Sequence, residues 1–266
     1  MTRPTSSEPP LPESSADSRD TTNDAPTTAS GGGRLWALVV GASIVAGLAA
    51  WLGGEASLNR IKPHSHAANS RGIILNLTGR REIAAADAKN AGVAFTLLGA
   101  SLGAALGVAG GLVRHSGRAA AKAALVGLIA VAAATAVMSL AILPAYNAYK
   151  AKHPDEASRD LILPLLVHVS IWSPVGAVGG WAFAVGLGAR ARLARIALGG
   201  LAGAALGAAA YELIGAAAFP SAQTTQFVSA TRETRLFARL TVTVLAAAGA
   251  ALAATEVRTR PAPPPS

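Results

Sequence analysis

The dominant pattern along the chain is a series of long apolar stretches separated by short polar segments. A helix rises about 1.5 Å per residue, so about 20 apolar residues are needed to cross roughly 30 Å of hydrocarbon. Six stretches have this length, at residues 35–54, 91–113, 123–143, 161–188, 196–219 and 236–254. Because only helices and closed barrels satisfy their backbone in hydrocarbon, the pattern predicts an all-α fold, a polytopic transmembrane helical bundle of about six spans.

Aromatic residues and prolines refine the limits of these spans. Trp36 and Trp51 stand at the two ends of the first span, where an aromatic belt is expected. The third span is predicted to stop at Pro144, because proline removes a helical hydrogen bond. Pro164 and Pro174 in the fourth span predict a kink or a break there.

The segments outside the spans divide into two tails and one long loop. Residues 1–33 and 258–266 are poor in large aliphatic side chains and are expected to be disordered arms. No positively charged start runs directly into an apolar stretch at Met1, so the first span is expected to be an uncleaved anchor. In the loop at 55–90, residues 72–90 are predicted to form an interfacial helix leading into the second span.

Composition agrees with a membrane protein. The chain is 52% hydrophobic and 14% charged, and it contains no cysteine, which excludes disulfides and thiolate chemistry. Its net charge of +9 is distributed in short clusters between the apolar runs, which favours membrane-flanking charge over binding of nucleic acid. The abundance of Ala, Gly, Arg and Pro is typical of a GC-rich bacterial genome, and a soluble, Ala-rich helical protein is the alternative to the membrane fold.

Basic residues in the short turns predict the orientation. Two turns carry Lys and Arg without Asp or Glu, and these residues are Arg114, Arg118 and Lys122 in one turn and Arg190, Arg192 and Arg195 in the other. Both turns are expected in the cytoplasm, and an even number of spans then places both termini there. Basic residues of the first loop argue the other way, namely Arg60, Lys62, Arg71, Arg80, Arg81 and Lys89.

Glycines recur at four-residue spacing in two spans. They are Gly99, Gly103 and Gly107 in the second span and Gly199, Gly203 and Gly207 in the fifth. Such faces let helices approach closely, so they are candidate contacts with a second copy or with a membrane protein partner. The sequence GAALG occurs at 103–107 and again at 203–207, which suggests inverted repeats of three spans each. There are two alternatives. The match is a coincidence in Ala/Gly-rich sequence, or spans two and three correspond in parallel to spans four and five.

Ionisable residues inside the spans mark the candidate binding site. Glu212 and His168 each lie seven residues inside the same end of their spans, at a depth of about 11 Å. A charge at that depth is costly unless it is paired. The hypothesis is that Glu212 pairs with His168 or Arg239 in an outer-leaflet polar pocket roofed by Trp172 and Tyr211. The pair would be either a packing contact between helices or a site for a proton or solute.

Other chemical motifs are weak. His64 and His66 lack a third ligand nearby, so we predict neither a metal site nor a cofactor. The chain has no G-x-S-G nucleophile of rhomboid proteases, no H-E-x-x-H and no phosphate-binding loop, so no catalytic residue is assigned. Two functions remain: a non-enzymatic packing or assembly component of the bacterial inner membrane, and a small secondary transporter with its site at Glu212 and His168.

Overall fold

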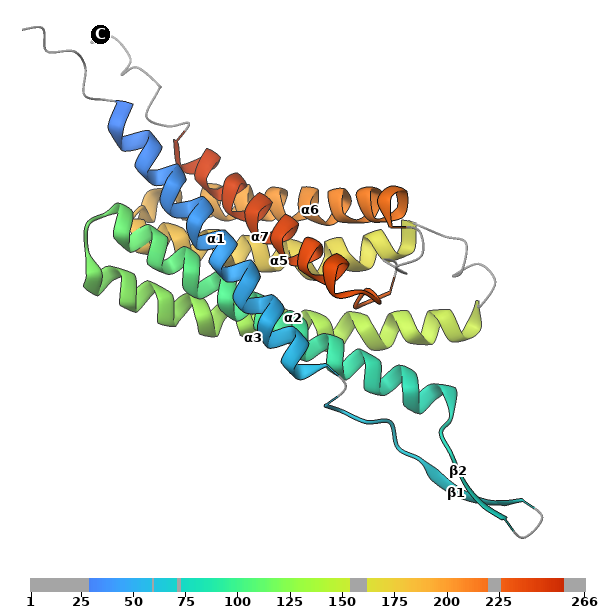
Figure 1. Ribbon diagram of the computed structural model, residues 1–266. Coiled ribbons are helices and arrows are strands. Elements are labelled where there is room, and N and C mark those ends of the chain that lie inside the picture. Colours follow the sequence, from blue (N-terminus) through green and yellow to red (C-terminus); the bar gives the residue numbers. More distant parts are fainter. Residues whose placement is uncertain (1–28, 59, 71–72, 154–161, 220–225, 256–266) are drawn as a thin grey trace, which may run out of the picture.

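A computed structural model describes residues 29–58, 60–70, 73–153, 162–219 and 226–255. In this part of the chain there are six long helices and a two-stranded hairpin (Figure 1). The helices are α1 (Ala29–Ser57), α2 (Arg80–Val113), α3 (Gly117–Lys152), α5 (Ile162–Leu187), α6 (Leu193–Ala218) and α7 (Arg232–Thr255). All six are long and apolar enough to cross a membrane, so the predicted all-α, six-span bundle is confirmed.

The helices form one bundle with two opposite ends. Helices α2, α3, α5 and α6 run alongside one another, while α1 and α7 contact each other and cross them at an angle (Figure 1). The amino-terminal end of α1 and the carboxyl-terminal end of α7 lie at the same end of the bundle. We call this the terminal end, and the opposite end, where α1 leads into the hairpin, the hairpin end.

Tight turns at the terminal end set neighbouring helices antiparallel. Helix α3 follows α2 after a short turn in which His115 has a φ of 60°. The hydroxyl of Ser116 then caps α3 by accepting a hydrogen bond from the Ala119 amide at 3.2 Å. Gly188, with a φ of +71°, ends α5 and leads into the 3-10 turn Arg190–Arg192 before α6.

Proline does not end α3, and the prediction of a helix end at Pro144 is wrong. The helix continues to Lys152, with Pro144 inside it. Contacts just after the proline compensate for its missing hydrogen bond: Tyr146 is buried with its ring 5.1 Å from that of Phe227, and Asn147 donates to the Ala84 carbonyl at 3.0 Å. Pro174 likewise lies within an unbroken α5, so the possible break in the fourth span is absent.

The predicted interfacial helix at 72–90 is only partly correct. Strand β2 (Ile73–Leu77) lies near its beginning and pairs antiparallel with β1 (His66–Ser70), with Ala68 opposite Leu75. The Ile-Ile-Leu run favours a strand, and Gly79 then precedes a helix that is continuous with the second span. The remainder of the predicted segment is therefore the first part of α2.

Glycines allow four helix pairs to approach at backbone distance. A Cβ added to Gly103 would lie under 3.0 Å from the backbone of Gly127, and the same holds for a Cβ added to the first glycine of each of the pairs Gly186–Gly107, Gly176–Gly200 and Gly199–Gly249. Both predicted glycine faces are thus covered inside this chain, the one on α2 by α3 and the one on α6 by α7. The glycines of the two GAALG segments accordingly contact the third helix of their own half.

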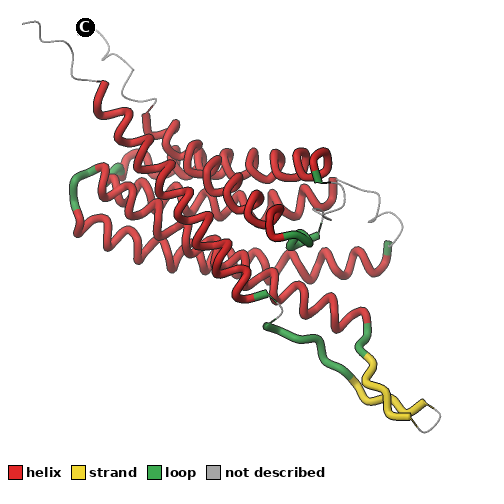
Figure 2. The backbone as a smooth tube through the Cα atoms, in the orientation of Figure 1, coloured by secondary structure: helices red, strands yellow, loops and turns green. Residues whose placement is uncertain are grey.

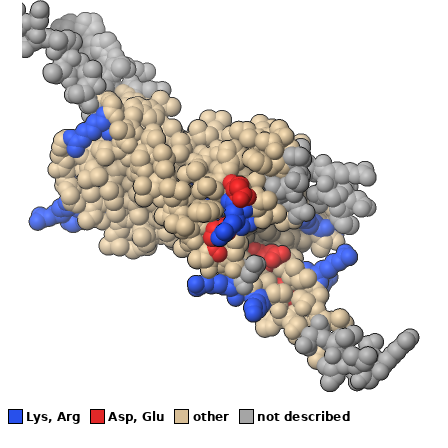
Figure 3. Space-filling model, in the orientation of Figure 1, with Lys and Arg blue, Asp and Glu red and all other residues tan. Residues whose placement is uncertain are grey.

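The outer surface of the bundle is apolar between its two charged ends. On α3, the helix with the smallest buried share, large aliphatic side chains point outward, with Leu140 75% and Val137 63% exposed. Figure 3 shows a broad belt free of charged side chains on the visible face, with Lys and Arg at both ends. Leaving such a side chain in water costs about 1.5–3 kcal/mol, so hydrocarbon is the solvent that this surface fits.

Candidate functional site

Glu212 and His168 meet in the core between α6 and α5. The close approach of Gly176 and Gly200 brings the two helices together, and three turns further along α6 the Glu212 carboxylate faces His168. His168 Nδ1 and Glu212 Oε1 are hydrogen-bonded, and the two residues are only 2% and 6% exposed. The structure therefore brings together one of the two pairs that the sequence suggested.

Aromatic rings enclose this pair. The Trp172 ring lies 4.7 Å from the His168 ring, and the Tyr211 ring meets the imidazole edge-on at 5.9 Å. Phe95 of α2 adds a third ring, also edge-on, at 6.5 Å. Sequence reasoning did not assign Phe95, although it is the only aromatic residue of the 91–113 span and therefore a candidate for packing against other rings.

The pair leaves part of its hydrogen-bonding capacity unused. Glu212 Oε2 is buried and has no hydrogen-bond partner among the described residues, and the same is true of Trp172 Nε1. A hydrogen shared between Nδ1 and Oε1 satisfies only one side of the carboxyl group. Since an unsatisfied buried oxygen costs about 1–3 kcal/mol, Oε2 is an acceptor for a proton or for a donor from a ligand.

Arg239 is buried nearby but does not pair with Glu212. Its Nη1 donates to the Ala94 carbonyl of α2 at 3.0 Å. Its Nη2 lies against Gly54 of α1, where a Cβ added to the glycine would be only 2.5 Å away. The guanidinium therefore faces α1 and α2, whereas the Glu212 carboxylate faces α5, so the two groups lie on different sides of the core.

A second ionic cluster, which sequence reasoning missed, joins α1 to α7 at the hairpin end. Glu55 accepts two hydrogen bonds from Arg235, at 2.5 Å to Nε and 2.9 Å to Nη2, and one from Arg232 Nε at 3.3 Å. Trp51 Nε1 adds a bond to the Arg232 carbonyl at 3.3 Å. Glu55 directly follows the first span and is separated from Arg235 by most of the chain, so only the packing of α1 on α7 reveals the cluster.

The histidines of the loop are separate from both clusters. His66 Nε2 lies 3.7 Å from Glu82 Oε1 near the start of α2. Within the described residues, no three His, Asp or Glu side chains are grouped closely enough to hold a metal ion.

Comparison with protein-family models, with curated proteins and with solved structures gives no match for this chain. The chain is an integral membrane protein. That assignment depends on the six apolar helices and their lipid-compatible exterior, and the function has to be inferred from the sites described above.

Proposed function

We propose that this protein is a non-enzymatic assembly component of the bacterial inner membrane that presents its β-hairpin to a partner. The hairpin extends well beyond the helices at the hairpin end (Figure 2). A two-stranded hairpin alone is marginally stable in water, so a projecting hairpin gains stability from a partner strand or surface. This projection is the observation that carries the proposal.

The root of the hairpin is fixed to the bundle, which supports a presenting role. The buried side chain of Asn90 accepts a hydrogen bond from the Ile61 amide and donates one to the Ile61 carbonyl, both at 3.0 Å. On the other side, β2 leads through Gly79 directly into α2. Because both strands start from anchored points, the hairpin has a defined direction relative to the membrane.

Charge supports a cytoplasmic terminal end and an external hairpin. Among the described residues of the two turns at the terminal end, basic side chains occur without Asp or Glu, whereas the hairpin end carries both signs, as Figure 3 shows for the visible face. The positive-inside rule then places both termini in the cytoplasm. The proposed partner accordingly meets the hairpin on the outer side of the membrane.

The test is the size of the native complex with and without the hairpin. Residues 65–78 are replaced by a short Gly-Ser linker, and membranes solubilised in mild detergent are compared by native electrophoresis. The wild-type chain is expected in a complex larger than the purified monomer, and the linker variant is expected to lose it. A control variant, Lys150→Ala with Lys152→Ala, changes the same end outside the hairpin and is expected to keep the complex. A complex that survives loss of the hairpin, or a wild-type chain that runs as a monomer, would contradict the proposal.

A second function is favoured by the unpartnered Oε2 of Glu212. A buried carboxyl group beside an imidazole suits proton-coupled transport of a small solute. Proteoliposomes with an imposed pH gradient and an internal pH-sensitive dye test this alternative. A transporter would be supported by proton flux that is lost in Glu212→Gln and kept in Glu233→Gln. Absence of flux in the wild-type protein would rule out this alternative.

A further inference from the structure

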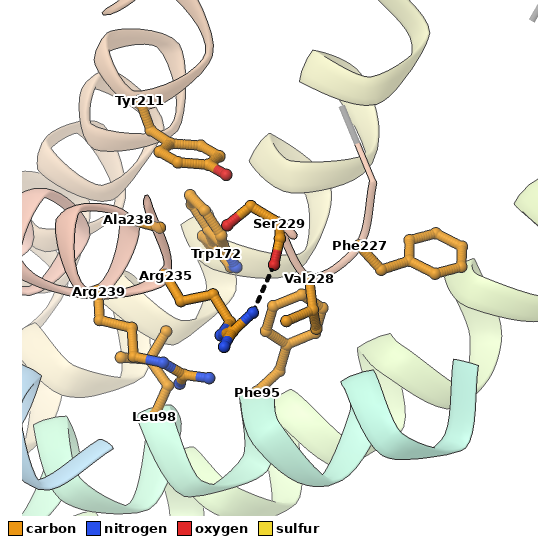
Figure 4. Close-up of a pocket in the computed structure, with 10 residues that line it drawn as sticks. All are labelled: Phe95, Leu98, Trp172, Tyr211, Phe227, Val228, Ser229, Arg235, Ala238 and Arg239. Carbon is orange, nitrogen blue, oxygen red and sulfur yellow. Dashed lines mark hydrogen bonds between the residues drawn. The ribbon is translucent and has the colours of Figure 1, made fainter. Parts of the chain in front are cut away.

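A small pocket lies between the Glu212 pair and the Glu55 cluster, where α2, α5, α6 and α7 meet. Its walls include Phe95, Trp172, Tyr211, Arg235 and Arg239 (Figure 4). The space open to the centre of a water-sized sphere is about 20 Å³, enough for one water molecule or one ion of similar size. Among the described residues that line it there is no Asp or Glu.

The positive charge beside this pocket exceeds the negative charge available to it. Arg239 is 6% exposed, and among the described residues no carboxylate lies within salt-bridge distance of its guanidinium. Its neighbour Arg235 shares the single carboxylate of Glu55 with Arg232. The Glu55 carboxylate is therefore occupied by Arg232 and Arg235, and a buried cation without a carboxylate of its own, such as Arg239, is unfavourable at membrane depth.

An unused donor of a different kind belongs to the same pocket. The Nε1–H of Trp172 is buried without an acceptor in the part of the chain that the structure describes, and Trp172 is 3% exposed. Figure 4 shows its indole and the two guanidinium groups arranged around the same space. Tyr211, whose hydroxyl is hydrogen-bonded to Ser229, lies next to Trp172, with the two ring centroids 5.7 Å apart. The pocket thus combines excess positive charge with a free N–H donor.

We propose that this pocket binds one small monovalent anion of halide size, with chloride as the natural candidate. The anion would accept from Trp172 Nε1 and would neutralise Arg239. A water molecule would fill the space and accept from the indole, but it would leave the charge of Arg239 unbalanced. This site is separate from the hairpin, and it shares Trp172 and Tyr211 with the surroundings of the Glu212 pair.

Anion-dependent thermal stability of the purified full chain tests the proposal. The protein in detergent is unfolded by heat in sodium chloride, sodium bromide or sodium gluconate at equal ionic strength. Chloride and bromide are expected to raise Tm above the gluconate value by about 3 °C or more. Trp172→Phe, which removes only the N–H donor, is expected to abolish most of that difference. Trp181→Phe, in the same helix but outside the pocket, is the matched control and is expected to retain it.

A second readout locates the anion and does not depend on how the variants fold. Crystals of the wild-type chain grown in bromide are expected to show an anomalous peak between Trp172 Nε1 and the Arg239 guanidinium. The proposal would be overturned if the wild-type Tm were equal in chloride and gluconate, or if Trp172→Phe and Trp181→Phe showed the same halide effect. It would also be overturned if the pocket contained no bromide, because the space would then be assigned to water.

Discussion

Replacing Gly103 by alanine tests whether the helices are packed as closely as the structure shows. The new Cβ would lie 2.6 Å from the Gly127 carbonyl carbon and 2.6 Å from Val131 Cγ2, and still closer to the Gly127 oxygen. Ordinary carbon contacts are about 3.5–4 Å, so α2 and α3 would have to separate by roughly 1 Å. Overpacking of this kind costs about 1–3 kcal/mol, which exceeds the gain of roughly 0.5–1 kcal/mol that alanine brings to a helix interior.

Gly41→Ala is the matched control, since nothing lies within 4 Å of a Cβ at that position on the exposed face of α1. Here only the helix propensity changes, so a gain of roughly 0.5–1 kcal/mol is expected. Thermal unfolding in detergent, followed by circular dichroism, should give a Tm below wild type for Gly103→Ala by about 2–6 °C and above it for Gly41→Ala by about 1–3 °C. If Gly103→Ala proved as stable as Gly41→Ala, the close approach of α2 and α3 would be refuted.

Three further predictions concern polar contacts. His168→Phe should destabilise the protein by about 3–5 kcal/mol because it strands a buried carboxyl group, and adding Glu212→Leu should recover most of the loss in a thermal double-mutant cycle. Arg235→Gln should lower the free energy of unfolding by about 1–3 kcal/mol, because Arg235 is 12% exposed and binds Glu55 with two hydrogen bonds. Arg232→Gln should lower it by at most about 0.5 kcal/mol, because Arg232 is 71% exposed. Equal unfolding midpoints for the two variants would argue against the cluster. Asn90→Ala should speed amide hydrogen exchange in the loop at 60–66 by about tenfold without changing exchange within α3, and unchanged loop exchange would mean that the root of the hairpin is not held there.

The spans could be predicted because hydrocarbon imposes a length and a polarity on every helix that crosses it. The helix ends could not, since a helix continues into water wherever local contacts support it. Helix α2 begins at Arg80, well before the apolar run, and α3 continues past Pro144 because Tyr146 and Asn147 are held by other parts of the chain. Hydropathy does not report such contacts. The predicted arms at 1–33 and 258–266 lie outside the described residues, apart from residues 29–33, which belong to α1.

Depth in the membrane was enough to suggest a contact between Glu212 and His168, because residues at one level on neighbouring helices can meet. Depth alone could not exclude Arg239, which lies about one turn nearer the same surface. Rotation about the helix axis decides between them: α7 directs Arg239 toward Ala94 and Gly54, and that rotation is set by helix packing. The sequence pattern carries no direct signal for the rotation of α7 about its axis.

The claim on which the account depends is that lipid surrounds the bundle between its ends. The chain lacks cysteine, so single cysteines can carry spin labels without background. In liposomes, a label at Leu140, which is 75% exposed on α3, should collide with oxygen and be shielded from a water-soluble nickel chelate, while a label at Leu77 in the hairpin, 56% exposed, should show the reverse. A label at Val131, fully buried, should be shielded from both. If Leu140 were as accessible to the chelate as Leu77, the membrane-spanning bundle would be contradicted.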